Sequence, residues 1–323
     1  MKAITIKQTG DASQLTVDNI AIPDPDDNEV LIKINYAGVN FIDIYQRMGK
    51  YPGPMPQVIG SEASGVVEKV GKNVKRFSYG DRVAYSMVFG AYAEYAVVPE
   101  DKLVTLPENI SFELGAAIML QGLTVEYLTS DCFNVEKDMN VFVHAAAGGV
   151  GLLLTQIIKE KGAKVIGTTS TEDKAELVYK AGADHIILYT QDDFLENATN
   201  YIGENQMHVV YDSVGKTTLT KSLSLLRPRG SLISFGQSSG SPPSINPLDL
   251  QKQGSIYLTR PTLASYIQNT SELEKRAKNL FQWINDGVLN IRIDRQLDID
   301  DAQEAHRLLE SRSTAGKMLL RVN

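Results

Sequence analysis

The pattern of hydrophobic and polar positions changes character near Gly122. Before it, Val30–Tyr36 alternates in strand fashion, and Gly65–Val70 and Arg82–Tyr85 are short apolar runs beside glycine-containing turns. Glycine and proline cluster over Gly49–Pro56, which predicts a loop. We therefore expect the N-terminal part of the chain to be rich in β-strand.

After Gly122, apolar strands alternate with helices, as a parallel sheet requires. Helices are predicted over Val150–Lys161 and Glu172–Ala181, closed by Gly162 and Gly182, and Ser170 or Thr171 could cap the second of them. The predicted strands are Val141–Val143, Lys164–Gly167, Ile186–Tyr189, Val209–Tyr211, Leu232–Phe235 and Ile256–Leu258. This α/β alternation is typical of a doubly wound nucleotide-binding fold.

Beyond residue 260 the alternation stops. The pattern predicts amphipathic helices over Leu273–Asp286 and Asp300–Ser311, and a final strand over Lys317–Arg321. This tail is too short for a domain of its own, so we expect it to pack on the N-terminal β-rich part. The predicted domains are 1–122 with 260–323, and 123–259.

Composition narrows the class of protein. The chain has 323 residues and a net charge of −7, without a block of Lys or Arg, so no nucleic-acid partner is expected. Neither a signal-peptide core nor a run of ~18 apolar residues is found, so no membrane partner is expected. With Cys132 as the single cysteine, a cytoplasmic protein is the simplest prediction.

The segment from Val141 to Gly151 carries the strongest chemical signal. It gives a buried strand, a glycine-rich turn and the start of a helix, with Ala146, Gly148 and Gly151 at the three glycine positions of G-x-G-x-x-G. Such a turn lets the backbone approach a pyrophosphate, and the helix N-terminus attracts its charge. A dinucleotide cofactor is therefore predicted.

The end of the second predicted strand favours NADPH over NADH. Thr168, Thr169 and Ser170 stand where an NADH site usually has a carboxylate. Lys174 lies in the first turn of the next helix, where a cation opposes the helix dipole unless a phosphate balances it. The alternative is a solvated lysine beside Glu172 and Asp173.

With these residues in hand, the chain resembles the zinc-independent quinone oxidoreductases, the zeta-crystallin-like group of the medium-chain dehydrogenase/reductase superfamily. The resemblance implies a GroES-like β-rich catalytic domain plus a Rossmann domain with a doubly wound parallel sheet. The stretches that carry it are Tyr36–Tyr45, Gly60–Gly65, Gly80–Val83, Leu120–Thr124, His144–Gly151, Tyr211–Gly215 and Phe235–Ser239.

Zinc is not expected, although the superfamily contains zinc alcohol dehydrogenases. The places of the catalytic zinc ligands correspond to Asn40, Ser61 and Leu120, which are poor ligands or none. The histidines show no ligand spacing, and His144, at a strand end, is expected to be packed or hydrogen-bonded. Without a Lewis acid, the acceptor should already be electron-poor, as quinones and conjugated enones are.

The resemblance also implies a set of site residues. Asn40 and Tyr45 are expected to orient the nicotinamide or bind the acceptor oxygen, and Tyr51 to gate the site or stack on the ring. The alternative for Tyr45 is a packed aromatic, and Asp43 is expected to tie down its loop. The expected cofactor-binding residues are Asn40, Tyr45, Gln121, Thr124, Ala147, Gly148, Gly149, Val150, Gly151, Thr169, Ser170, Lys174, Tyr189, Ser213, Phe235, Gly236, Gln237, Ser238 and Arg312. For Arg312 the alternative is a surface arginine at a helix end.

Three functions stay open at this point. The first is an NADPH-dependent quinone oxidoreductase, and the second is an NADPH-dependent enone or alkenal double-bond reductase using the same site. The third is an NADPH-binding structural or RNA-binding protein, against which the acidic net charge counts. The resemblance also implies a homodimer in which two Rossmann sheets pair edge to edge, and the apolar edge segment Ser255–Thr259 suits such pairing. The sequence alone would allow a monomer.

Overall fold

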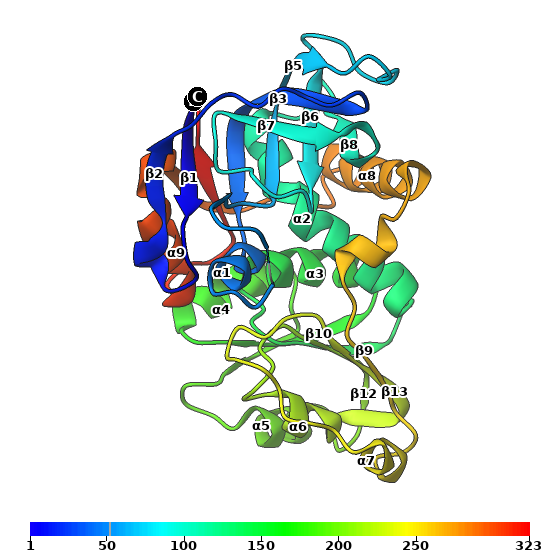
Figure 1. Ribbon diagram of the computed structural model, residues 1–323. Coiled ribbons are helices and arrows are strands. Elements are labelled where there is room, and N and C mark those ends of the chain that lie inside the picture. The colour runs from blue at the N-terminus through cyan, green and yellow to red at the C-terminus, as the bar shows by residue number, and fades with distance from the viewer. Residues whose placement is uncertain (52) are drawn as a thin grey trace. The chain divides into compact units, whose positions relative to one another are not determined.

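The computed structural model describes residues 1–51 and 53–323, which form two compact units (Figure 1). The first unit comprises Met1–Leu123, Tyr266–Gln282 and Ile291–Asn323, and the second comprises Thr124–Ser265 with Trp283–Asn290. No helix in the part of the chain that the structure describes is long and apolar enough to cross a membrane.

The second unit is built on a parallel six-stranded sheet in the order β11-β10-β9-β12-β13-β14. Strands are added outward from β9 on both sides, so the doubly wound fold predicted from the sequence is confirmed. The strand bounds are β9 Asn140–Val143, β10 Lys164–Thr169, β11 His185–Leu188, β12 Met207–Asp212, β13 Leu226–Ser234 and β14 Tyr257–Thr259.

Helices cover both faces of this sheet (Figure 1). One apolar core joins Phe142, Ile166 and Val210 of the strands to Phe194 of α5 and Leu219 of α6. The opposite face packs on α3 and α4. The helices are α3 Gly149–Glu160, α4 Glu172–Lys180, α5 Phe194–Ile202, α6 Leu219–Leu223 and α7 Pro247–Lys252, with a π-helical turn, η3, at Leu128–Cys132.

Local signals explain where two of these helices begin and end. Gly162 and Gly182 follow α3 and α4 with φ of +78° and +106°, a conformation that glycine adopts without strain. Of the two candidate caps for α4, Thr171 is the one used: its hydroxyl accepts from the Lys174 N–H at 3.4 Å.

The first unit is a β structure whose strand pairs are antiparallel except for the parallel pair β15–β16. Its larger sheet runs β15-β16-β3-β5-β6-β8 with β7 paired to β3, and its smaller sheet runs β2-β1-β4. Residues Met318–Arg321 of β16 pair antiparallel with Tyr36–Val39 of β3, so the C-terminal tail does pack on the N-terminal β-rich part, as predicted. The strand bounds are β1 Lys2–Ile6, β2 Thr16–Asn19, β3 Glu29–Val39, β4 Gln57–Val58, β5 Glu62–Val70, β6 Arg82–Ser86, β7 Tyr95–Pro99, β8 Leu103–Thr105, β15 Ile293–Asp298 and β16 Lys317–Arg321.

Strand β5 divides its side chains between two environments. Ala63 and Val67 point into the apolar core with Tyr85 and Val83 of β6. Glu62 and Ser64 lie on the other face, where Ser64 Oγ donates to the Phe112 carbonyl and Glu62 Oε1 accepts from the Leu120 N–H. Helix α2 (Phe112–Tyr127) therefore covers the polar face of β5.

The remaining helices that begin in this unit are α1 Phe41–Arg47, α8 Thr270–Asn285 and α9 Ala302–Glu310, with short 3₁₀ turns η1 Ala12–Gln14, η2 Glu100–Lys102 and η5 Ile299–Asp301. A further 3₁₀ turn, η4, spans Leu263–Tyr266. The predicted loop at Gly49–Pro56 includes Pro52, which lies outside the described residues. Its other residues are turn, bend or coil, ahead of β4.

Two stretches of the tail differ from the predicted grouping, and the shorter one, residues 260–265, continues the second unit past the predicted boundary. Trp283–Asn290 groups with the second unit, although the sequence places 260–323 with the catalytic domain. Reciprocal hydrogen bonds explain this: Gln156 Nε2 donates to the Asn290 carbonyl at 3.2 Å, and the Asn290 N–H donates to Gln156 Oε1 at 2.7 Å. The assignment of functions to the two domains stays a proposal.

Candidate active site

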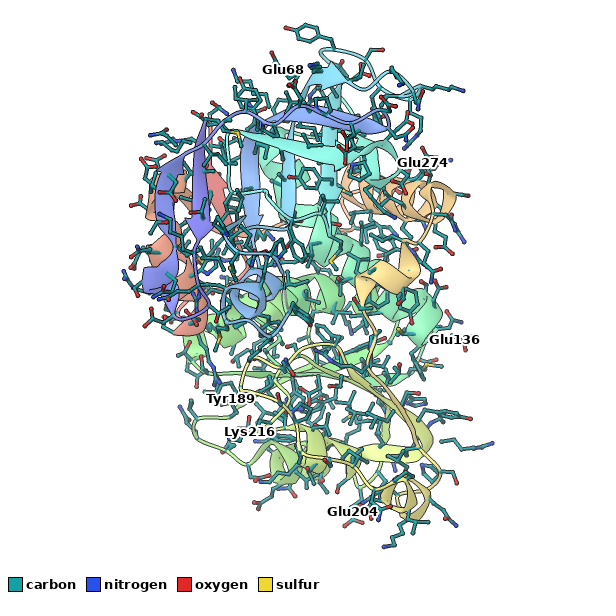
Figure 2. The ribbon with its side chains drawn as sticks, viewed as in Figure 1. Glu68, Glu136, Tyr189, Glu204, Lys216 and Glu274 are labelled. Atoms are coloured by element: carbon teal, nitrogen blue, oxygen red, sulfur yellow. The ribbon has the colours of Figure 1, made fainter. Side chains whose placement is uncertain are left out.

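The carboxyl edge of the parallel sheet brings together the cofactor residues predicted in the second unit. In doubly wound sheets, ligands bind at this edge. Tyr189, at the end of β11, is 39% exposed and is labelled in Figure 2. The predicted residues follow five of the strands: Ala147–Gly151 come after β9, Thr169 and Ser170 end β10, Tyr189 follows β11, Ser213 follows β12, and Phe235–Ser238 follow β13.

The glycine turn after β9 is held by backbone hydrogen bonds. The Ala146 N–H donates to the Thr168 carbonyl at 2.9 Å, and the Gly148 N–H donates to the Ala145 carbonyl at 2.9 Å. A Cβ at Gly151 would lie 2.5 Å from the Ala145 oxygen, so only glycine fits there. Helix α3 begins after Gly148 without a side-chain cap, which leaves its first N–H groups available to an anion. This turn fits a pyrophosphate.

The hydroxyl groups at the end of β10 differ in whether they hold the turn or lie beyond it. Thr168 Oγ1 accepts from the Ala145 N–H at 3.2 Å, and Thr169 Oγ1 donates to the Thr171 carbonyl at 3.3 Å, so both buried threonines are used within the turn. Ser170 and Lys174 are half-buried beyond them. A hydroxyl and an ammonium, with no carboxylate at the strand end itself, are donors suited to a 2′-phosphate.

His144 is a structural residue of this unit, as expected from its place at a strand end. Its Nε2 lies 2.8 Å from Ser222 Oγ and its Nδ1 lies 3.3 Å from Thr168 Oγ1. The ring also makes edge contacts with Phe142 and Phe194. Burial lowers the pKa of His144 to about 4, so the imidazole is neutral at physiological pH.

In the first unit, Asn40 is the centre of a buried polar cluster. It is 4% exposed and precedes α1, and its N–H donates to Asp43 Oδ2 at 2.8 Å. Its amide Nδ2 donates to Glu62 Oε2 at 2.8 Å and to the Gly38 carbonyl at 3.3 Å. Its Oδ1 accepts from Lys317 Nζ at 2.7 Å and from Gln121 Nε2 at 3.3 Å. Both donors of the amide and both lone pairs of its oxygen are therefore engaged.

Two members of this cluster were not predicted as site residues. Glu62 and Lys317 form an ion pair at 2.5 Å, with side-chain exposures of 0% and 1%. Glu62 lies within the motif Gly60–Gly65, and Lys317 is the charged residue that opens the otherwise apolar run Met318–Leu320. The charge of Lys317 next to an apolar strand was a signal in the sequence for a buried ion pair, because a buried charge needs a partner of opposite sign.

Asp43 ties down its loop, as expected. The carboxylate accepts from Ser61 Oγ at 2.6 Å and from the Tyr92 hydroxyl at 3.0 Å, besides the Asn40 N–H. Burial raises the pKa of Asp43 to about 6, and the hydrogen bonds from Ser61, Asn40 and Tyr92 oppose that rise. The carboxylate is therefore ionised at pH 7.

A directional hydrogen-bond chain leads from Asp43 toward the surface. The Tyr92 hydroxyl lies 3.3 Å from His306 Nε2, and Arg47 Nη1 lies 3.1 Å from His306 Nδ1. Burial and the Arg47 charge lower the pKa of His306 to about 3. Because arginine can only donate, the neutral ring carries its proton on Nε2 and donates to Tyr92, which donates to Asp43. Arg47 also pairs with the exposed Glu310 at 2.7 Å.

The positions that correspond to zinc ligands meet in this cluster but do not fit zinc. The Asn40 amide and the Leu120 backbone N–H donate to Glu62, and the Ser61 hydroxyl donates to Asp43. An amide, a hydroxyl and a leucine are a poor donor set for zinc. Among the described residues, no group of three His, Cys, Asp or Glu side chains could hold a metal ion.

The predicted aromatic residues lie on α1 and the loop after it. Tyr45 is 7% exposed, and its ring centroid is 6.1 Å from that of Tyr51, which is 40% exposed. Lys50 Nζ lies 5.0 Å from the Tyr45 ring centroid. Tyr45 therefore has a packed ring, and the roles of both tyrosines toward a ligand stay predictions.

The other predicted residues are placed as follows. Gln121, on α2, is half-buried and contacts Asn40, whereas Thr124, on the same helix, is 7% exposed. Arg312 lies in the exposed turn after α9 with φ of +59°, and its contact with the cofactor also stays a prediction.

Comparisons with known proteins agree with this architecture. Residues 26–108 match the family described as "Alcohol dehydrogenase GroES-like domain", and residues 181–320 match "Zinc-binding dehydrogenase". A GroES-like unit together with a doubly wound sheet defines a medium-chain dehydrogenase/reductase.

Individual relatives identify the family within this superfamily. The chain is 44% identical to quinone oxidoreductase 1 of Escherichia coli, over 92% of each protein. It is 37% identical to a 2-haloacrylate reductase from a Burkholderia species, over 98% of each protein. A crystal structure of Escherichia coli quinone oxidoreductase complexed with NADPH matches all of both chains with a TM-score of 0.97 and 41% identity. The chain belongs to the quinone oxidoreductase family.

Proposed function

We propose that the protein is an NADPH-dependent quinone oxidoreductase that works without a metal. The observation that carries this proposal is the full-length match to a quinone oxidoreductase complexed with NADPH, at a TM-score of 0.97. The carboxyl edge of the second-unit sheet supplies the required cradle: a glycine turn for the pyrophosphate, and Ser170 with Lys174 for the ribose phosphate.

NADPH, when bound, supplies a hydride from its nicotinamide ring. The protein's part is to bind and orient it. The backbone of Ala147–Gly151 holds the pyrophosphate, Thr169, Ser170, Lys174 and Tyr189 surround the adenosine ribose phosphate, and Ser213 with Phe235–Ser238 lie along the nicotinamide half. Support for this assignment comes from the place of these residues at the ends of five parallel strands, with Lys174 in the first turn of α4 just after β10.

The acceptor needs little activation. A quinone is electron-poor, so the net addition of one hydride and one proton converts its two carbonyls to the hydroxyls of the hydroquinone without a Lewis acid. Tyr45 and Tyr51 contribute an aromatic wall, with their ring centroids 6.1 Å apart. We assign the proton to solvent, because Asp43 is fully buried and its carboxylate oxygens already accept from Ser61, Asn40 and Tyr92.

Reduction of an activated carbon–carbon double bond is the second candidate. The Burkholderia relative named as a 2-haloacrylate reductase supports it, since that name implies a conjugated alkene as the acceptor. Both reactions use the same cofactor, and both acceptors are electron-poor conjugated systems. They differ in the acceptor alone.

The experiment that tests the proposal is a panel of acceptors followed by the loss of nicotinamide absorbance. Benzoquinones and naphthoquinones are compared with alkenals and 2-haloacrylates at a fixed NADPH concentration, with and without a chelator. We expect quinones to have the highest kcat/KM and the chelator to leave it unchanged. Turnover of alkenes alone would reverse the order of the two candidates, and loss of activity in chelator would refute the metal-free proposal.

We also propose a homodimer that works in the cytoplasm. Strand β14 is the edge of the second-unit sheet, and Tyr257 on it is 63% exposed, so an apolar edge is available for pairing with a second copy. Cys132, the single cysteine, cannot form a disulfide within the chain, which suits a reducing compartment. Light scattering would give the mass of a dimer; Tyr257→Glu should give the monomer mass.

A further inference from the structure

In the second unit, the β12 loop (213–217) and the β13 loop (235–240) are joined by hydrogen bonds. The Ser238 N–H, for example, donates to the Ser213 carbonyl at 3.1 Å. A Cβ at Gly236 would lie 2.6 Å from the same carbonyl oxygen, so this close approach requires glycine. The two loops therefore form one structure, which we call the double loop.

The sheet order places the double loop on one side of the glycine turn. The strands run β11-β10-β9-β12-β13, and the turn follows β9 in the middle. A dinucleotide lies across the carboxyl edge at this point, with one mononucleotide on each side of its pyrophosphate. Ser170 and Lys174, the proposed partners of the 2′-phosphate, follow β10, which leaves the side of β12 and β13 for the nicotinamide half. Residues 213–214 and 235–240 are half-buried, so a ligand can reach them.

Asp212, the last residue of β12, is bonded to both loops. Its Oδ1 accepts from the Val214 N–H at 2.7 Å and from the Gly215 N–H at 3.0 Å. Its backbone carbonyl accepts from the Phe235 N–H at 2.9 Å and from the Gly236 N–H at 3.3 Å. Asp212 itself is 0% exposed, so its side chain holds the double loop without being open to a ligand.

The partners of the Asp212 carboxylate are neutral donors. Besides the two N–H groups at Oδ1, its Oδ2 accepts from the Thr218 hydroxyl at 2.8 Å, and Thr218 Oγ1 accepts from the Gly215 N–H at 3.1 Å. Burying a carboxylate costs free energy, which these hydrogen bonds offset. An apolar side chain would avoid that cost but would leave the loop N–H groups without this acceptor. The fixed shape of the β12 loop is therefore what the acid contributes.

We propose that Asp212 is a positioning residue for the nicotinamide half of NADPH. Its carboxylate fixes the β12 loop and its carbonyl fixes the start of the β13 loop, so that Ser213 and Phe235–Ser238 are in place before the cofactor binds. This inference rests on the proposed function, because it takes NADPH as the ligand of this edge of the sheet. Asp212 contacts neither cofactor nor acceptor and acts through the double loop.

The test compares the two halves of the cofactor. Adenosine 2′,5′-bisphosphate carries the phosphorylated adenosine ribose and lacks the nicotinamide half, so calorimetric titrations with it and with NADPH report on the two sides of the glycine turn. Asp212→Ala removes the carboxylate acceptor. We expect this variant to raise the Kd for NADPH about tenfold, equivalent to one hydrogen bond, and to change the Kd for the bisphosphate less than about twofold.

Asp212→Asn separates the shape of the loop from the charge of the acid. Asparagine keeps Oδ1 as the acceptor for the Val214 and Gly215 N–H groups, and its amide can donate to Thr218 Oγ1. The asparagine variant should therefore restore the Kd for NADPH to within about twofold of the wild type.

Thr218→Val keeps the test decisive if Asp212→Ala does not fold. It removes one donor to the carboxylate and leaves the acid in place. We expect a rise of about three- to tenfold in the Kd for NADPH, with the Kd for the bisphosphate unchanged.

The matched control is Asp184→Ala, at the amino ends of β10 and β11 and therefore at the edge of the sheet opposite the cofactor. Asp184 Oδ2 accepts from the Val165 N–H at 2.7 Å and pairs with Lys159 at 2.9 Å. Loss of these contacts should lower the melting temperature and change both Kd values less than about twofold.

Three results would overturn the inference: wild-type NADPH affinity in folded Asp212→Ala or Thr218→Val, an equal loss of affinity for NADPH and for the bisphosphate, or an asparagine variant that binds NADPH as weakly as the alanine variant. The proposed function fails by a different result, which is the absence of quinone reduction by wild-type protein that binds NADPH.

Discussion

The Cα of Gly151 approaches the Ala145 carbonyl so closely that a Cβ there would lie 2.5 Å from its oxygen. A backbone oxygen inside the turn cannot move away without breaking the hydrogen bond that the Gly148 N–H donates to it. The glycine at position 151 is therefore required for α3 to start directly after β9, where its N-terminus can meet a pyrophosphate.

Gly151→Ala should therefore cost stability and cofactor affinity together. We expect a loss of about 1–3 kcal/mol in the free energy of unfolding, the usual range for overpacking. Calorimetry and NADPH titration measure the two effects. Gly148→Ala is the comparison, since its Cβ would lie 3.2 Å from the same oxygen, and it should destabilise less. Equal stability of the Gly151→Ala and wild-type proteins would contradict the geometry of this turn.

Lys174→Ala tests the choice of cofactor. If the ammonium binds the 2′-phosphate, the variant should weaken NADPH by about 10- to 150-fold, the range for one charge-assisted hydrogen bond, and leave NADH nearly unchanged. Fluorescence titration with both dinucleotides gives the ratio. Lys180→Ala, in the last turn of α4 with a side chain that is 74% exposed, serves as the control. An equal loss of affinity for NADPH and NADH would show that Lys174 does not bind the 2′-phosphate.

Tyr45→Phe separates a polar role of Tyr45 from packing. The ring contact with Tyr51 survives the change, so the melting temperature should stay close to that of the wild type. If the Tyr45 hydroxyl binds the acceptor oxygen, its removal should lower kcat for the quinone about tenfold. Steady-state kinetics at saturating NADPH measure it. Unchanged kcat would make Tyr45 a packing residue only.

Asp43 should make part of the stability depend on pH. Its pKa is raised from 3.8 to about 6 by burial, so the folded protein binds a proton that the unfolded chain releases in this range. The stability contribution of the protonated carboxyl is therefore lost as pH rises from about 4 to about 6, on the order of 3 kcal/mol in total. Above about pH 7 the contribution is constant.

Asp43→Asn isolates this effect, because asparagine does not titrate. The difference in unfolding free energy between wild type and variant should shift in favour of the wild type as pH falls from 6 to 4. Denaturant unfolding at several pH values measures it. A difference that does not vary with pH would show that the carboxyl of Asp43 titrates alike in the folded and unfolded states.

The sequence predicted the sheet of the second unit well because its signals are local. Apolar strands, glycine stops after α3 and α4, and a cap at Thr171 each act over a few residues, and the sheet order follows from strand–helix alternation. The short strands β1, β2, β4, β7, β8 and β15 and the helices α1, α2, α5, α6 and α7 were not predicted. Many span two to six residues, too short for a periodic pattern to stand out.

The candidate site was predicted only in part, for a related reason. Strand ends, glycines and the Thr168–Lys174 segment identify the cofactor edge from sequence alone. The cluster at Asn40 depends on long-range pairing instead: Lys317 reaches it because β16 lies beside β3, 277 positions along the chain from Asn40. Nothing near Lys317 in the sequence indicates that Glu62 and Asn40 are its partners.

The most direct test of the central claim is a single turnover of the protein with NADPH bound and p-benzoquinone added in the absence of oxygen. Nicotinamide absorbance and hydroquinone are both quantified against a protein-free mixture, because quinones also react slowly with NADPH alone. We predict that one hydroquinone forms for each NADPH consumed, much faster than in the protein-free mixture. A rate equal to that of the protein-free mixture, with NADPH demonstrably bound, would contradict the account.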